Sequence, residues 1–155
     1  QMTEPLRHQI DLRCSQHHAF LTFTEKVDLW WPPGHRRFER SQLSMEPIRG
    51  GQLVETSADG ARFVLADIRV CEPPVRLVFD WHPGKISAPT ETEITFIATD
   101  VHHSQVRIEH REGGAELGTQ WPGRAALFNK GWSAVLGALA NHIVSTSEGN
   151  GHERP

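Results

Sequence analysis

Hydrophobic and polar residues alternate along much of the chain, which is the signature of β-strands with one buried face. Near the N-terminus, His8, Ile10, Leu12 and Cys14 alternate with polar neighbours and predict a half-buried strand. Further stretches with strand character cover 41–47, 53–56, 63–71, 75–81, 92–99 and 105–111. Because most of these stretches are separated by short turns, the pattern predicts an antiparallel meander of seven strands.

The dipeptide Pro73-Pro74 separates two of these strands. Proline donates no backbone hydrogen bond and fixes φ, so neither strand can run through it and a turn is expected there. In the strand that follows, Leu77, Phe79 and Trp81 alternate with smaller or polar residues. Three large apolar side chains therefore share one face of the sheet, and another element must cover that face.

Other turns are marked by glycine and proline. Gly50-Gly51 interrupts the early strands, and Pro83-Gly84 opens a polar loop that ends at Pro89. Asp59-Gly60 predicts a two-residue hairpin, because the tight primed turns need positive φ values.

Two short helices are expected after the first strand. Ser15 is a suitable N-cap for a helix that runs through Phe23. A second helix around 25–29 should end by Trp31, because Pro32-Pro33 cannot continue it.

A longer helix is predicted near the C-terminus, and it is the one long amphipathic element available to cover the sheet. Pro122 suits its first turn. Apolar residues then recur at helical spacing over some twenty residues, namely Phe128, Trp132, Val135, Leu139 and Ile143. Gly131 is unfavourable inside a helix, so we expect it to allow a close approach of the helix backbone to a neighbour.

The chain of 155 residues is long enough for one domain with a sizeable core, which we expect over 7–146, with flexible termini at 1–6 and 147–155. A net charge of −3 without a basic stripe argues against nucleic acid as a partner. No apolar run is long enough to span a membrane, and 1–13 lacks the apolar segment of a signal peptide. Cys14 and Cys71 are expected to be buried free thiols. These features predict a cytoplasmic protein.

Histidines are the first candidates for chemistry. His17-His18 and His102-His103 lack a third ligand at metal-binding spacing, so we expect surface histidines and no metal or other cofactor. His110 has the same parity as Val106 and Ile108, so its ring should face inward. A hydrogen-bonded core histidine is the favoured interpretation, and orientation of a ligand is the functional alternative.

Four motifs then occur in order along the chain. They are Trp30-Trp31-Pro32-Pro33, Ile48-Arg49-Gly50-Gly51, Glu72-Pro73-Pro74 with Leu77-Val78-Phe79 and Trp81, and Gly131-Trp132 with Leu136 and Leu139. From about Arg7 to Val144 the sequence resembles the bacterial, stress-related proteins akin to the activator of the ninety-kilodalton heat-shock-protein ATPase. These belong to the START and birch-pollen-allergen (SRPBCC) superfamily.

The resemblance implies an α+β helix-grip fold, in which a curved seven-stranded antiparallel sheet wraps around the C-terminal helix and leaves a hydrophobic cavity between them. Ala66, where a glycine is common, and Pro47, inside a strand, depart from the family pattern. Members of the superfamily bind lipids, sterols or polyketides, some cyclise polyketides, and some act as co-chaperones.

Three hypotheses for function remain open. The first is a non-catalytic protein that holds a small hydrophobic or amphipathic molecule in the cavity. The residues expected to line the ligand site are Phe20, Trp31, Phe79, Trp81, Phe96, His110, Phe128, Trp132 and Val135. The second is a cyclase or hydrolase-type enzyme that uses His110 as a general acid or base. The third is an interaction module for a chaperone or client, and an exposed sheet edge also leaves a homodimer open.

Overall fold

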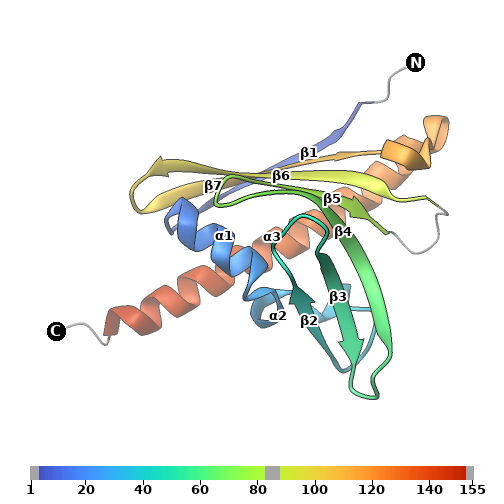
Figure 1. Cartoon of the computed structure of the whole chain (residues 1–155). Coiled ribbons are helices and arrows are strands. Elements are labelled where there is room, and N and C mark those ends of the chain that lie inside the picture. Colours follow the sequence, from blue (N-terminus) through green and yellow to red (C-terminus); the bar gives the residue numbers. More distant parts are fainter. Residues whose placement is uncertain (1–3, 83–87, 153–155) are drawn as a thin grey trace.

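One curved antiparallel sheet forms the body of the protein. The computed structural model describes residues 4–82 and 88–152, with 148–152 described by their backbone alone. The strands are β1 (Leu6–Leu12), β2 (Ser41–Met45), β3 (Gln52–Ser57), β4 (Arg62–Glu72), β5 (Arg76–Trp81), β6 (Thr90–Asp100) and β7 (His103–Arg111). Their order across the sheet is β1-β7-β6-β5-β4-β3-β2, and Figure 1 shows how β2, β3 and β4 bend away from the other strands. The predicted meander of seven strands is confirmed.

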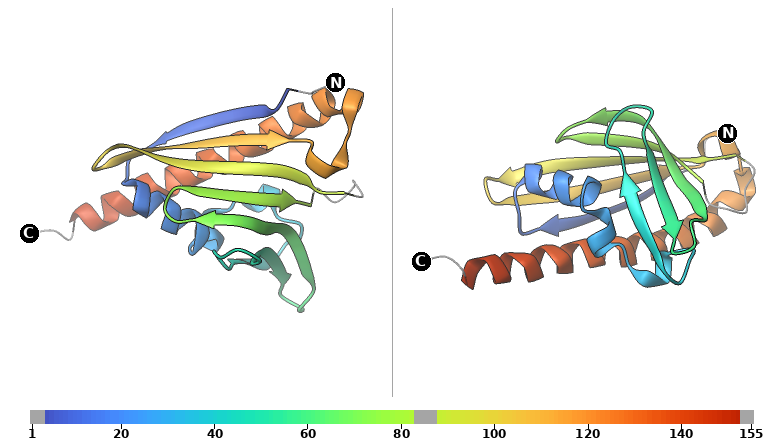
Figure 2. Two further views of the ribbon diagram at one scale, coloured as in Figure 1. Left: turned by 45° about the horizontal axis from the view of Figure 1, so that its top comes forward. Right: turned by 60° about the horizontal axis from the view of Figure 1, so that its bottom comes forward.

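The helices cover the concave face of this sheet. They are α1 (Gln16–Thr24), α2 (Val27–Trp30) and α3 (Trp121–His152), with single 3₁₀ turns η1 (Pro33–His35), η2 (Gly113–Ala115) and η3 (Gly118–Gln120). Ser15 caps α1 as predicted, because its side chain accepts a hydrogen bond from the His18 N–H at 3.1 Å. Figure 2 shows α3 running diagonally under the sheet, with α1 and α2 beside it. The fold is therefore the α+β helix grip that the resemblance implied.

The core lies between α3, α1 and the inner face of the sheet. Leu77, Phe79 and Phe96 from the sheet and Leu136 and Leu139 from α3 have no exposed surface. Burial of side chains of this size contributes about 1.5–3 kcal/mol each. The C-terminal helix is thus the cover that the alternation in β5 required.

Helix α3 is longer than its apolar pattern predicted. It continues past Val144 to His152, although 145–147 are exposed. A helix satisfies its backbone hydrogen bonds internally, so it can extend beyond the last core contact. The predicted flexibility of the termini stays a prediction, and residues 1–3 and 153–155 lie outside the described residues, as does 83–87 of the predicted polar loop.

The turn at Asp59-Gly60 differs from the predicted two-residue hairpin. Ser57 donates its N–H to the Ala61 carbonyl at 2.8 Å, and Gly60 donates to the Ser57 carbonyl at 3.0 Å. Gly60 alone in this turn has a positive φ, of 95°. The longer loop needs the left-handed conformation at one position only, and glycine supplies it.

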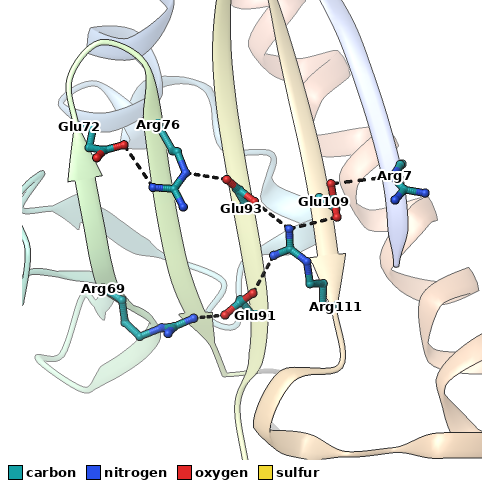
Figure 3. Close-up of polar contacts among 8 residues, drawn as sticks. All are labelled: Arg7, Arg69, Glu72, Arg76, Glu91, Glu93, Glu109 and Arg111. Carbon is teal, nitrogen blue, oxygen red and sulfur yellow. Dashed lines mark hydrogen bonds and ion pairs between the residues drawn. The ribbon is translucent and has the colours of Figure 1, made fainter. Parts of the chain in front are cut away.

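The convex face of the sheet carries a network of arginine and glutamate side chains, drawn in Figure 3. Arg111 bridges β7 to β6 through Glu91 and Glu93, both at 2.7 Å, and Arg69 and Arg76 extend these pairs to β4 and β5. Hydrogen bonds from Arg76 and then Arg111 lower the pKa of Glu93. A hollow of about 730 Å³ lies over this face, and of its charged lining Arg7, Glu93 and Glu109 are engaged in such pairs, while Arg107 donates a hydrogen bond to Gln105.

His17-His18 and His102-His103 are exposed, as predicted, and the thiols are placed largely as expected. Cys14 is buried, Cys71 is half-buried rather than buried, and both are free. Burial raises the pKa of both thiols. Among the described residues, no group of three or more His, Cys, Asp or Glu side chains could hold a metal ion. No helix in the described ranges is long and apolar enough to cross a membrane.

Gly51 provides the first testable prediction. A Cβ atom at this position would lie 2.2 Å from the Glu46 carbonyl oxygen, a backbone atom that cannot move aside easily. We expect Gly51→Ala to lower the free energy of unfolding in urea by about 1–3 kcal/mol, because the loop between β2 and β3 must shift. Gly34→Ala is the control, since nothing lies within 4 Å of its Cβ position. Equal stability of the two variants would contradict the predicted clash.

Candidate functional site

The candidate site is an apolar pocket at the edge of the core, where α3 faces the end of β5 and the segment around η1. Its volume is about 300 Å³, at the small end of the range for ligand sites. Its lining consists of Trp31, His35, Trp81, Leu127, Phe128, Lys130, Gly131, Trp132 and Val135. We call it the indole pocket, because three tryptophans contribute to its wall.

The local sequence explains how each part of the pocket wall is placed. Trp31 ends α2 because Pro32-Pro33 follows it, and the 3₁₀ turn after the prolines brings in His35. Trp81 is the last residue of β5. The wall from α3 is a stripe at helical spacing, in which Phe128 and Val135 lie almost two turns apart.

Five of the nine sequence-predicted site residues line this pocket: Trp31, Trp81, Phe128, Trp132 and Val135. Phe20, Phe79 and Phe96 do not line it. They pack in the core, where Phe20 meets Phe96 edge to face with ring centroids 5.2 Å apart. His110 lies behind the wall and touches two lining residues.

The tryptophan rings belong to a continuous row of aromatic contacts. Ring centroids are 5.5 Å apart for Trp30 and Trp31, 6.2 Å for Trp31 and Trp81, and 5.5 Å for Trp81 and Trp132. The indole N–H of Trp31 donates to the His35 carbonyl at 3.1 Å. This row joins α2, β5 and α3, three elements far apart in the sequence, and three of its four rings line the pocket.

His110 holds Trp132 from within the core. An indole N–H can only donate, so the 3.0 Å contact from Trp132 Nε1 makes Nδ1 of His110 the acceptor. Nε2 of the neutral imidazole therefore carries the proton and donates to Thr90 Oγ1 at 2.7 Å. Burial lowers the pKa of His110 to about 3, because the low-dielectric interior disfavours the imidazolium. The predicted inward ring is confirmed, and its partners identify a hydrogen-bonded core histidine.

Arg36 fixes the segment that carries Trp31 and His35. Its guanidinium donates to the Asp28 carboxylate at 2.8 Å and to the Asp28, Trp31 and Ser41 carbonyls at 2.7, 2.9 and 3.2 Å. The Asp28 carboxylate also accepts the Leu43 N–H at 2.8 Å. One side chain thus ties α2, the loop and β2 together, and the planar fork of arginine suits several acceptors at once.

A buried carboxylate holds the next part of the loop. Glu55 has no exposed surface, and its two oxygens accept the N–H groups of Arg37 and Phe38 at 2.8 and 2.9 Å. Sequence reasoning missed both Glu55 and Arg36. The parity that Glu55 shares with inward Leu53 was a signal for the first, whereas only the fold brings Arg36 to its acceptors.

Gly131 does not serve the close approach that was predicted. A Cβ atom there would lie 3.9 Å from His35 Cε1, which is ordinary van der Waals contact, so the prediction that the backbone needs glycine here is wrong. The missing side chain instead leaves open part of the pocket wall, which Gly131 lines.

Comparison with known proteins gives the family. The sequence profile for "Activator of Hsp90 ATPase homolog 1-like protein" matches residues 14–143, most of the chain. The chain belongs to this family. The predicted relationship to the activator within the SRPBCC superfamily is therefore confirmed. No curated protein matches the chain in a sequence search.

Solved structures show the same fold. A self-sacrificing resistance protein, CalC from Micromonospora echinospora, is 23% identical with a TM-score of 0.68 and covers 92% of this chain and 96% of its own. The Aha1 dimer from Colwellia psychrerythraea is 15% identical with a TM-score of 0.64 and coverages of 91% and 96%. An anthrahydroquino-γ-pyrone synthase complexed with SUM is 28% identical with a TM-score of 0.56 and coverages of 81% and 88%.

Proposed function

We propose that the protein binds a small hydrophobic or amphipathic molecule in the indole pocket and holds it without chemical change. The observation that carries this proposal is an open apolar pocket in the side of an otherwise close-packed core. Large apolar side chains are mostly covered in this protein, yet in the pocket wall Trp81 is only half-buried and Leu127 is 61% exposed. An uncovered apolar concavity of this kind is typical of a ligand site.

The fixed wall supports the proposal. The N–H groups of Trp31 and Trp132 are bonded inside the protein, so both rings keep their orientation in the absence of a ligand. Binding to a preformed wall avoids the entropic cost of ordering these side chains. The similar synthase is named for an anthrahydroquinone-pyrone, an aromatic small molecule, which supports a flat aromatic ligand.

Binding of phenylnaphthylamine, a neutral two-ring fluorophore, tests this proposal. We expect its fluorescence to rise on binding and that of the pocket tryptophans to fall. Gly131→Leu places a side chain in the pocket and should weaken binding by roughly tenfold or more, since each 1.4 kcal/mol of lost contact is tenfold.

Gly123→Leu is the matched control, because Gly123 lies in the same helix with nothing within 4 Å of its Cβ position. It should bind the fluorophore like the wild type. Absence of binding, or equal binding by both variants, would overturn the proposed site. Native mass spectrometry of freshly purified protein can then identify a ligand retained from the cell.

An enzyme that uses His110 is the second hypothesis, and the similar synthase is the observation that favours it. The geometry speaks against His110 as the acid or base, because both ring nitrogens are engaged and the ring does not line the pocket. We therefore assign His110 a positioning role toward Trp132. The predicted cytoplasmic location, homodimer and chaperone partner stay predictions.

A further inference from the structure

The rim of the indole pocket carries a cationic side chain, that of Lys130. Lys130 and His35 are both exposed and both line the pocket. Among the described residues, no Asp or Glu belongs to the lining, and Lys130 has no ion-pair partner. By contrast, Arg76 and Arg111 on the convex sheet face are paired with carboxylates.

The tryptophan side chains of the wall can only donate hydrogen bonds. Trp31 and Trp132 use their N–H groups inside the protein, whereas the N–H of Trp81 has no hydrogen-bond partner within the described part of the chain. An indole N–H and an ammonium group are donors only. The Trp81 and Lys130 side chains of the lining therefore offer donors only, and their complement is an apolar molecule that carries acceptors or negative charge.

We infer that the indole pocket selects aromatic anions, such as aromatic carboxylates, sulfonates or phenolates, over neutral aromatics of the same shape. This rests on the proposed function. The rings of the ligand lie among the indole faces, and its anionic group lies at the mouth, within reach of Lys130. The long side chain of lysine suits this role, because its apolar stem follows the wall while the ammonium group stays in water.

A matched pair of fluorophores tests the inference. Anilinonaphthalene sulfonate has the ring system of phenylnaphthylamine plus one sulfonate group. We expect the wild type to bind the sulfonate more tightly than the neutral compound by roughly three- to fivefold, the size of a partly exposed ion pair. Added salt should reduce this preference, because it screens exposed charges, and should not weaken binding of the neutral compound.

Lys130→Met removes the charge and keeps the length of the side chain. It should abolish the preference for the sulfonate, which is read as the ratio of the two affinities, so that any change in the apolar wall affects both fluorophores alike. Lys26→Met is the control, because Lys26 is exposed and does not line the pocket. Trp81→Phe keeps a ring but removes the free N–H, and should weaken the sulfonate more than the neutral compound.

The outcomes separate the two proposals. Equal affinities of the wild type for both fluorophores, or a preference that survives Lys130→Met, would overturn selection of anions while leaving the pocket as a ligand site. Binding of the sulfonate that persists in Gly131→Leu would place the fluorophore outside the pocket and overturn both. Loss of the preference in Lys130→Met, with the preference kept in Lys26→Met, supports the inference.

Discussion

His110→Phe is expected to lower the free energy of unfolding at pH 7 by about 2–4 kcal/mol, because each of two buried polar groups loses its partner at a cost of about 1–3 kcal/mol. The ring would still pack on Phe128, whose centroid lies 4.2 Å from that of His110. The Trp132 N–H and the Thr90 hydroxyl would remain buried without their hydrogen bonds. Urea unfolding followed by tryptophan fluorescence measures the difference.

The same residue predicts how stability depends on pH. The folded pKa of His110 is lowered to about 3, and an unfolded histidine titrates near pH 6.5. Between these values the unfolded chain binds a proton that the folded protein does not, so stability is fully present above about pH 6.5 and is lost as the pH falls. From pH 7 to pH 5 the loss attributable to His110 is about 2 kcal/mol.

Urea unfolding of His110→Phe at pH 7, 6 and 5 should show a much smaller dependence on pH. A residual slope of the same sign is expected from His18, whose pKa is also lowered, first by partial burial and then by the charge of Lys26. Thr90→Val is the control, because it removes one hydrogen bond and keeps the histidine, so its slope should match the wild type. A full slope in His110→Phe would contradict the buried neutral imidazole.

The second large effect is expected at Arg36, which is 14% exposed. Arg36→Ala should lower the free energy of unfolding by about 2–3 kcal/mol, because three carbonyl groups and the partly exposed Asp28 carboxylate lose their hydrogen bonds to the guanidinium. Arg36→Lys should recover little of the lost stability, since one ammonium group cannot donate to all of these acceptors at once. Chemical denaturation provides the measurement.

Arg37→Ala is the matched control for Arg36. The Arg37 guanidinium lies over the Phe63 ring at 4.4 Å from its centroid, an exposed contact worth about 0.5–1 kcal/mol. Phenylnaphthylamine binding adds a second readout, because Arg36 fixes the segment that places Trp31 and His35 in the pocket wall. Similar stability and similar binding in Arg36→Ala and Arg37→Ala would show that the guanidinium does not hold this wall.

Much of the fold could be predicted because its signals are local. The alternation of Leu77, Phe79 and Trp81 follows from the pleat of a strand, and Pro73-Pro74 ends the strands on either side whatever surrounds it. The apolar stripe predicted helix α3, but the predicted C-terminal end came too early, because a helix also extends where no other element covers it. The predicted two-residue hairpin at Asp59-Gly60 was wrong in detail, because the identity of a dipeptide does not fix the length of the loop around it.

The site was predicted in part. Large inward rings mark a wall or a core equally well, so Phe96 and Trp132 could not be told apart by sequence. His35 and Arg36 carry no periodic signal, and their roles depend on where the loop after Pro32-Pro33 lies against α3 and β2. Lys130 reads in sequence as an ordinary exposed lysine.

The sequence alone determined the strands, the covering helix, the family resemblance and an inward His110, because each depends on residue type and spacing along the chain. The tertiary structure alone decided which aromatic rings border open space. It also decided that the nitrogens of His110 are engaged with Trp132 and Thr90, and that Lys130 lies at the pocket rim. These properties arise from distances between residues far apart in the sequence, and no local pattern encodes them.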